Sequence, residues 1–405
     1  MRVALLTREF PPDVYGGAGV HVEYLSRELA RRLDLRVHCF GAPRESPLVA
    51  GAYRPWELLA GPSPSSAALE AMSVDLAMAA AVEGADLVHS HTWYTNLGGH
   101  LAGLLHGIPH VATTHSLEPL RPWKAEQLGG GYALSSLCER LGLEGADAVI
   151  AVSRQMRRDV LACYPAIDPE RVVVIHNGID PREYRPDPDP GVPERLGIDP
   201  GRPSVVFVGR ITRQKGIVHL LEAAPMIDAT AQLVLLAGAP DTPEIAAEVR
   251  GLYAQAQSRR GGVVWVDTML PRREVIAVLS QASVFVCPSV YEPFGLVNLE
   301  AMACETAVVA SAVGGIPEIV VPGETGLLVP CEVADSGTAP DPAAARRFAA
   351  GLAEAVNRLL ADPGEAERMG RAGRRRVVDH FDWEVIAAHT QELYARVVAR
   401  SLNPR

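Results

Sequence analysis

Lysine is nearly absent from this chain of 405 residues, because only two of its 38 basic residues are lysines, Lys124 and Lys215. Lysine carries a compact charge on a thin stem and reaches a phosphate where a guanidinium would clash. Each lysine is therefore a candidate phosphate ligand, with random residue choice under codon bias as the alternative.

Positive net charge, paired cysteines and long apolar runs are also missing. The formal net charge of −10 argues against non-specific binding of nucleic acid or an anionic membrane. The six cysteines form no C-x-x-C pair, which predicts reduced thiols. The apolar run before Thr7 is too short for a signal peptide. We expect a cytoplasmic protein without a nucleic-acid or membrane partner; the oligomeric state stays open, with a homodimer as one alternative.

Short, continuous apolar runs recur along the chain with helical stretches between them. Such runs are typical of parallel strands covered on both faces, and their alternation with helices predicts doubly wound α/β domains. The expected strands are Val3–Thr7, Leu35–Phe40, Asp86–Ser90, His110–Thr114, Asp147–Val152, Val172–Ile175, Ser204–Val208, Leu233–Ala237, Val263–Val266, Val284–Cys287 and Ala307–Ala310.

A proline-rich, acidic stretch over residues 180–191 divides the strands into two sets and is interpreted as a linker. We expect two Rossmann-like domains that face a cleft, over residues 1–180 and 181–382. Asp187-Pro-Asp189 resembles the D-x-D metal motif but lies in this linker, and no other metal constellation stands out, so no metal cofactor is expected. In open α/β sheets ligands bind beyond the carboxyl ends of the strands, so informative residues should follow strands.

The first expected strand of the second domain is followed by a loop with two cations, Arg210 and Lys215. A guanidinium fork and an ammonium point charge together suit a diphosphate. Solvated loop charges are the alternative interpretation.

A second motif follows the strand Val284–Cys287, where Gly295 marks a loop and a helix begins near Leu296. The free N–H groups of Leu296 and Val297 at such a helix start would point toward a phosphate.

Two carboxylates flank this helix start. Glu292 lies in the loop and Glu300 lies in the second helical turn, and helical side chains lean back toward the N-terminus. Both could accept hydrogen bonds from sugar hydroxyls on either side of a diphosphate. The alternative is that the helix dipole favours acids here.

The first domain offers a glycine pair and a histidine. Gly16 and Gly17 lie between a strand and a helix, where backbone N–H groups can approach an anion, although a turn without a ligand is the alternative. His115 directly follows the strand His110–Thr114 and could bind a sugar hydroxyl, or could be a capping or core histidine.

An acceptor site is expected in the same domain. Trp93 and Trp123 could stack on sugar rings, and Lys124, beside Trp123, could pair with an acceptor phosphate. Arg158 is a weaker candidate, and tryptophans that anchor loops in the core are the alternative.

Taken together, these motifs resemble glycosyltransferase family 4, which has the GT-B fold. The Glu-x7-Glu pair, the Gly-Arg…Lys-Gly segment over residues 209–216, the paired glycines and His115 occur in the family's order over nearly the whole chain. The resemblance implies a retaining, metal-independent hexosyltransferase with an N-terminal acceptor-binding domain and a C-terminal domain that binds a nucleotide-sugar donor. It also implies that the last helix, 383–401, packs back on the N-terminal domain.

The resemblance implies a role for each motif. Arg210 and Lys215 would hold the diphosphate, Glu292 the transferred sugar, Glu300 the ribose, and His115 the sugar near its O6. Carboxylates about 5–5.5 Å apart would suit a covalent double displacement. Because donor binding accounts for both acids, we favour a front-face displacement in which leaving-group stabilisation is the main catalytic contribution.

A closer resemblance is carried by residues 7–19 and 121–131, which are similar to the actinobacterial glycogen-synthase-type members. Those enzymes use ADP-glucose and build α-1,4 links on glucose 1-phosphate, giving maltose 1-phosphate, or on glucan. The Lys-Thr-Gly-Gly-Leu motif of other bacterial glycogen synthases is absent. We therefore favour glucose 1-phosphate as the acceptor, with glucan-chain extension, or transfer to a lipid or small molecule, as alternatives.

Three other classes compete with a transferase. A dehydrogenase would need G-x-G-x-x-G with an acid about 20 residues further on, which this chain lacks. A sugar-nucleotide epimerase of the same fold would need no distinct acceptor pocket, and the third alternative is a sugar-binding protein without catalysis. The donor base stays open among ADP, UDP and GDP.

Overall fold

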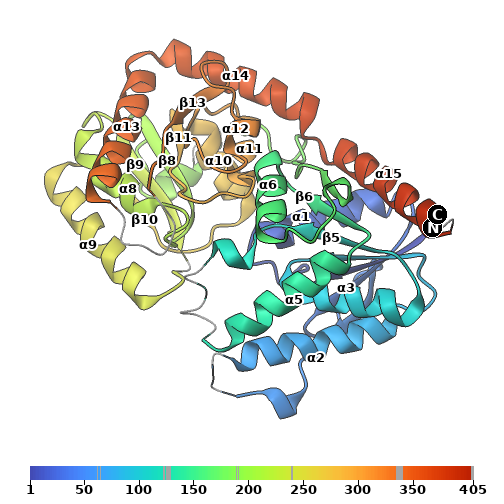
Figure 1. The fold of residues 1–405 in the computed structure, drawn as a ribbon. Coiled ribbons are helices and arrows are strands. Elements are labelled where there is room, and N and C mark those ends of the chain that lie inside the picture. Colours follow the sequence, from blue (N-terminus) through green and yellow to red (C-terminus); the bar gives the residue numbers. More distant parts are fainter. Residues whose placement is uncertain are drawn as a thin grey trace. The chain divides into compact units, whose positions relative to one another are not determined.

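The computed structural model describes residues 1–61, 63, 65–121, 124, 129–187, 189, 191–238, 240–333 and 341–402. The chain forms two compact units, Met1–Gly178 together with Trp383–Arg405, and Ile179–Asp382 (Figure 1). Each unit contains one parallel sheet covered by helices on both faces. The expected class, two doubly wound α/β lobes, is confirmed.

The first unit has a seven-stranded sheet in the order β3-β2-β1-β4-β5-β6-β7. All its neighbouring strands are parallel. The strands are Arg2–Thr7 (β1), Asp34–Phe40 (β2), Val49–Tyr53 (β3), Leu87–His91 (β4), His110–Thr114 (β5), Ala148–Ala151 (β6) and Val172–Val174 (β7). The helices are Gly17–Leu29 (α1), Ser66–Ala81 (α2), Trp93–His106 (α3), Gly131–Gly145 (α5), Arg154–Cys163 (α6) and Trp383–Leu402 (α15).

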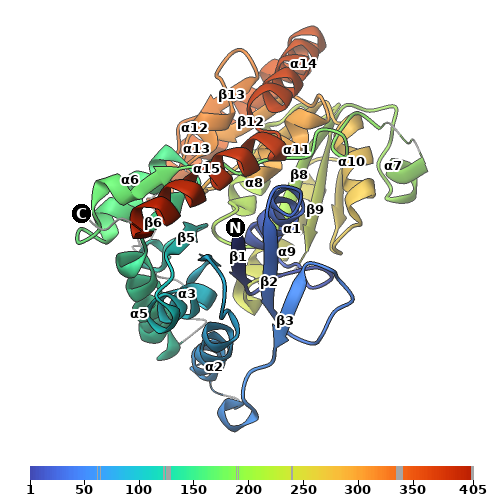
Figure 2. The ribbon, with the colours of Figure 1, turned by 90° about the vertical axis from the view of Figure 1, so that its right-hand side faces the viewer.

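Strand β1 shows why its sequence is continuously apolar. Val3 and Leu5 pack with side chains of α1 and α15 in one cluster, whereas Ala4 and Leu6 pack with α2 and α3 in another. Both faces are thus buried, as parallel sheets require. Figure 1 shows α2, α3 and α5 together, and Figure 2 shows α1 beside β1 and β2.

The second unit has a six-stranded parallel sheet in the order β10-β9-β8-β11-β12-β13. The strands are Ser204–Arg210 (β8), Gln232–Gly238 (β9), Val263–Val266 (β10), Val284–Cys287 (β11), Val308–Ser311 (β12) and Gly326–Val329 (β13). The helices are Gly191–Arg195 (α7), Ile217–Ala223 (α8), Pro243–Arg259 (α9), Arg272–Gln281 (α10), Leu296–Ala303 (α11), Ile316–Ile319 (α12), Pro342–Ala361 (α13) and Pro363–His380 (α14).

Two strands were not expected from the sequence, β3 and β13, and each lies at an edge of its sheet. The stretch interpreted as a linker begins just after the boundary between the units and includes the start of α7. Across the described ranges, no helix combines the length and the apolar character needed to cross a membrane.

Candidate functional site

Two loops at the carboxyl ends of adjacent strands carry the candidate donor residues of the second unit. The loop after β8 and the loop after β11 are joined where the Val290 N–H donates to the Gln214 carbonyl at 2.9 Å. Gly216 has φ +64°, and a Cβ there would lie 1.9 Å from the Pro288 carbonyl oxygen. Only glycine permits this contact, which brings Lys215 beside the second loop.

The contact produces an ion pair between the two loops. The Lys215 Nζ lies 2.7 Å from Glu292 Oε2, and the side chains are 23% and 7% exposed. The Ser289 hydroxyl donates to the same carboxylate oxygen at 3.1 Å. Burial alone would lower the pKa of Lys215, but the Glu292 carboxylate and the neighbouring Cys287 outweigh it, so the pKa is raised and the ammonium stays charged.

A third loop, which the sequence analysis missed, supports Glu292 from the backbone. The Gly315 N–H donates to the Glu292 carbonyl at 3.0 Å. Gly314 has φ +55°, and a Cβ there would lie 1.8 Å from the same carbonyl oxygen. The sequence could have indicated this loop, because Gly314 and Gly315 follow β12 just as the other motifs follow their strands.

Arg210, at the end of β8, is oriented by Asp241. Its Nη1 donates to Asp241 Oδ1 at 2.9 Å, and the side chains are 25% and 17% exposed. A guanidinium has five N–H donors in a fixed fork, so this bond to Asp241 helps to set its direction. Asp241 was not expected from the sequence.

Helix α11 begins at Leu296, with Gly295 as the residue before its first turn. The N–H groups of Leu296 and Val297 therefore lie in the first turn, where a helix has unpaired donors and a partial positive charge. Glu300 lies in the next turn and accepts a hydrogen bond from the Tyr184 hydroxyl at 3.3 Å. Burial raises the pKa of Glu300, and this hydrogen bond opposes the shift.

In the first unit, the glycine loop is closed by an internal carboxylate. Helix α1 begins at Gly17, and Glu9 Oε2 accepts hydrogen bonds from the N–H groups of Tyr15 and Gly16 at 2.7 and 2.8 Å. The carboxylate that these N–H groups bind is a side chain of the chain itself, and the expected phosphate contact of this loop stays a prediction. A phosphate could bind the Gly16 N–H only after Glu9 moves.

His115 follows β5 directly and contacts two further histidines. Its Nε2 lies 3.2 Å from His91 Nδ1, at the end of β4, and its ring centroid lies 4.6 Å from that of His21 on α1. Burial lowers the pKa of all three imidazoles, that of His21 to about 4. They are therefore neutral near pH 7 and offer lone pairs as well as N–H donors.

The structure describes three of the four residues that were expected to bind the acceptor. Trp93 is only 5% exposed and packs in a hydrophobic cluster with Leu97 and Cys138. The expectation that its ring stacks on a sugar is therefore corrected, because Trp93 is a core residue. Arg158 is exposed on α6 and donates to Gln155 of the same helix. Trp123 lies outside the described residues.

Lys124 is half-buried, and the loop before it rests on a buried polar network. The Arg121 Nη1 donates to the Ser116 hydroxyl at 3.0 Å and lies 3.8 Å from Glu118. The Glu118 N–H donates to Glu139 Oε1 at 2.9 Å. This pair of acids was not expected from the sequence.

The Glu139 carboxyl is held protonated near neutral pH. Burial and then the charge of Glu118 raise its pKa to about 8, although the hydroxyl of Tyr164 donates to it. The proton on Glu139 lets two acids lie together below the loop without mutual repulsion.

Two protein-family sequence models match this chain, one over most of the first unit and one over much of the second. Residues 15–183 match the sequence model of Glycosyltransferase Family 4, and residues 191–339 match that of Glycosyl transferases group 1. The chain belongs to glycosyltransferase family 4 and is a retaining hexosyltransferase of the GT-B fold.

Individual relatives show to which members of the family this chain is similar. The chain is 56% identical to α-maltose-1-phosphate synthase of Mycolicibacterium smegmatis over 98% of this chain and 100% of that protein. It is 29% identical to glycogen synthase of Mycobacterium tuberculosis, over 100% and 97% of the two chains. Among solved structures, sucrose-phosphate synthase of Thermosynechococcus elongatus superposes with a TM-score of 0.76 at 29% identity, covering 98% and 99% of the chains.

The raised pKa of Glu139 predicts a pH-dependent stability. Between pH 4.5 and 8 the folded chain keeps a proton that the unfolded chain releases, so the free energy of unfolding falls as pH rises. Glu139→Gln cannot lose this proton. Relative to wild type, we expect the variant to gain up to about 3 kcal/mol between pH 5.5 and 8, at about 1.4 kcal/mol per pKa unit.

Denaturant unfolding at both pH values measures this difference. Glu144→Gln is the matched control, since Glu144 lies on the same helix α5 but is only half-buried. Parallel pH profiles for wild type and Glu139→Gln would contradict the assignment of the proton to Glu139.

Proposed function

We propose that this chain transfers glucose from a nucleotide-glucose donor, ADP-glucose by preference, to α-glucose 1-phosphate, giving α-maltose 1-phosphate. The observation that carries the proposal is the 56% identity, over both full lengths, to an α-maltose-1-phosphate synthase. Identity to a glycogen synthase is about half as high, at 29%. The competing classes, dehydrogenase, epimerase and sugar-binding protein, are set aside because the chain is a family 4 transferase.

In this proposal the second unit binds the donor diphosphate. Lys215 and the guanidinium of Arg210 meet the phosphate oxygens, together with the first-turn N–H groups of Leu296 and Val297. Gly295 permits the sharp entry into that helix. Charge-assisted hydrogen bonds of this kind are short and roughly twice as strong as neutral ones.

The two carboxylates complete the donor site. Glu292, oriented by Lys215 and by the Gly315 N–H, contacts the transferred glucose, and Glu300 contacts the ribose. In the first unit, Gly16 and Gly17 approach the donor phosphate and His115 contacts the sugar near O6.

The reaction then proceeds on one face of the sugar. The bond between the anomeric carbon and the diphosphate oxygen breaks while the 4-hydroxyl of the acceptor attacks the same carbon from the same side. The hydroxyl proton passes to the departing phosphate oxygen, so no enzyme base is required. Stabilising the leaving group is then the main catalytic contribution, and removal of one such donor typically costs about 10²–10³-fold in rate.

The acceptor phosphate is assigned to Lys124 on the loop supported by the Glu118–Glu139 pair. A lysine there favours a phosphorylated sugar over an uncharged glucan end, since a glucan offers no partner for its charge. Trp123 and Arg158 stay candidates of lower weight in the same site.

The most direct test offers ADP-glucose together with glucose 1-phosphate and glycogen in competition. We expect maltose 1-phosphate as the main product, identified by mass spectrometry, and a lower rate with UDP-glucose and GDP-glucose. Glucose incorporated mainly into glycogen would overturn the choice of acceptor and favour chain extension.

Lys215→Ala should lower kcat by roughly 10²–10³-fold, because the cation that stabilises the leaving diphosphate is lost. Arg213→Ala is the matched control, since Arg213 lies in the same loop but pairs with Glu248 at the surface, with 61% and 42% exposed side chains. The control should keep nearly the wild-type rate.

Removing Lys215 also leaves Glu292 without its ion-pair partner, which costs up to roughly 3–5 kcal/mol for a fully buried pair and less for this partly exposed lysine. Thermal unfolding of both variants therefore accompanies the kinetics. A folded Lys215→Ala protein that transfers within threefold of wild type would refute the donor-site assignment.

Lys124→Ala should raise KM for glucose 1-phosphate by at least about tenfold, since a charge-assisted contact is worth roughly 1.5–3 kcal/mol. Its KM for ADP-glucose should change little. Arg140→Ala removes an exposed cation from α5 and serves as the control. Equal effects of Lys124→Ala on glucose 1-phosphate and on glycogen would remove the proposed role.

A further inference from the structure

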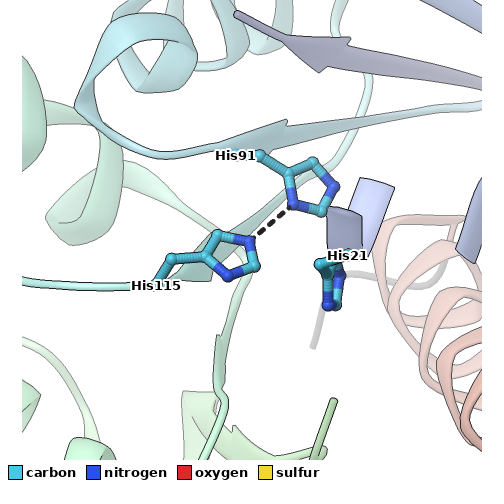
Figure 3. A group of neighbouring side chains, drawn as sticks. All are labelled: His21, His91 and His115. Atoms are coloured by element: carbon cyan, nitrogen blue, oxygen red, sulfur yellow. Dashed lines mark hydrogen bonds between the residues drawn. The ribbon is translucent and has the colours of Figure 1, made fainter. Parts of the chain in front are cut away.

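Three imidazoles from different elements of the first unit converge on one point (Figure 3). His21 comes from α1, His91 from the end of β4, and His115 from the residue after β5. One nitrogen of each ring lies within 4.8 Å of one nitrogen of each of the others. The pair formed by His91 Nδ1 and His115 Nε2 is 3.2 Å apart.

This spacing is close to that of ligands around a small cation. A tetrahedral zinc ion with bonds of about 2.0–2.1 Å holds its ligand nitrogens roughly 3.3 Å apart. The His91–His115 separation of 3.2 Å is already close to this value. His21 needs to approach by at most about 1.5 Å, the difference between 4.8 Å and 3.3 Å.

Two of the rings carry buried nitrogens that lack a hydrogen-bond partner. His21 Nε2 and His91 Nε2 are both in this position, among the described residues. Whichever ring donates in the His91–His115 hydrogen bond, Nε2 of His91 is left unpaired. Buried polar atoms normally have partners, and a cation held by His91 Nδ1, His115 Nε2 and His21 Nε2 would supply one to His21.

Asn177 determines the tautomer of His21. Its Oδ1 accepts from His21 Nδ1 at 2.8 Å, which places the ring proton on Nδ1 and the lone pair on Nε2. A metal-binding histidine characteristically donates its other N–H to an oxygen in this way. The arrangement is therefore that of a ligand with its outer-shell partner in position.

His89 provides an internal contrast. Its ring centroid lies 4.2 Å from that of His91, yet both its nitrogens are bonded, to the Tyr394 hydroxyl at 2.6 Å and to the Thr113 hydroxyl at 2.7 Å. Buried histidines of this unit can thus be fully satisfied by their neighbours. His110, outside the cluster, also has a buried nitrogen, Nδ1, without a partner among the described residues, so what distinguishes the cluster is that three rings converge.

We propose that His21, His91 and His115 form a binding site for one divalent transition-metal cation, of which Zn²⁺ is the best match. Three neutral nitrogen ligands favour a borderline metal such as Zn²⁺ or Co²⁺ over Mg²⁺ or Ca²⁺, which prefer oxygen. His115 is half-buried, which leaves an open side for a water molecule as the fourth ligand. The cation replaces the His91–His115 hydrogen bond.

The consequence for activity is inhibition, and this step rests on the proposed function. A metal ion on His115 occupies the nitrogen that would otherwise bind the donor sugar. Zn²⁺ is therefore an inhibitor of this transferase and not its cofactor.

Binding is tested with Co²⁺ alone, whose visible absorption reports tetrahedral nitrogen coordination, followed by displacement with Zn²⁺. We expect one tight equivalent in the wild-type protein. His91→Gln and His115→Gln should each weaken binding by more than about tenfold, the lower end of what loss of an outer-shell partner alone causes. Thermal unfolding shows that each variant is folded.

The matched control is His38→Gln. His38 is a buried histidine of the same unit, outside the cluster, bonded to the Tyr53 hydroxyl at 2.8 Å, with a pKa lowered by burial to about 4. This variant should bind Co²⁺ as the wild type does. The same Co²⁺ affinity and spectrum in wild type and in both cluster variants would overturn the proposal.

An activity assay separates the site from its consequence. Zn²⁺ should inhibit the wild type and His38→Gln at the concentration that displaces Co²⁺. Tight binding without inhibition would support the metal site and contradict the role of His115 in donor binding. Absence of binding would remove the site and leave the proposed function unaffected.

Discussion

The ion pair between Lys215 and Glu292 is the interaction on which the geometry of the proposed donor site depends. Its members come from loops after two neighbouring strands, and a single charge in this half-buried position would be costly without the other. The close approach of Gly216 to Pro288 and of Gly314 to Glu292 makes the pair possible. The glycines of these loops are thus required by the charges and not only by the turns.

Most of the fold was predictable because a parallel sheet buried on both faces leaves continuous apolar runs in the sequence. An edge position alone does not explain why β3 and β13 were missed, because β7 and β10 are also edge strands and were expected from their apolar runs. In β3 the residues Val49–Tyr53 are only partly buried and include a glycine, so no apolar run marks them. A strand of this kind is held by the backbone of its neighbour β2, and a local sequence pattern carries little of that information.

The loops of the proposed donor site were predictable for a related reason, since the sequence marks each of them by one strand end and one helix start. Trp93 shows where this logic fails: it also follows a strand, yet its ring packs inward against Leu97 and Cys138. Position after a strand places a residue at the correct edge of the sheet but does not determine which way its side chain points. Asp241, Glu139 and Asn177 were missed because their partners are distant in the sequence.

The histidine cluster depends both on the ends of neighbouring strands and on a contact between residues distant in the sequence. His91 and His115 end neighbouring strands, so their proximity follows from the parallel register of β4 and β5. His21 joins them only because α1 packs on the same sheet, a contact that no local pattern encodes. Burial then has two effects on the same rings: it keeps them unprotonated, as a hydroxyl-binding group requires, and it leaves nitrogen lone pairs without partners. If these imidazoles contact the donor sugar as proposed, the neutral lone pairs that suit this role also suit a borderline cation such as Zn²⁺, so the same burial that serves transfer would expose it to inhibition.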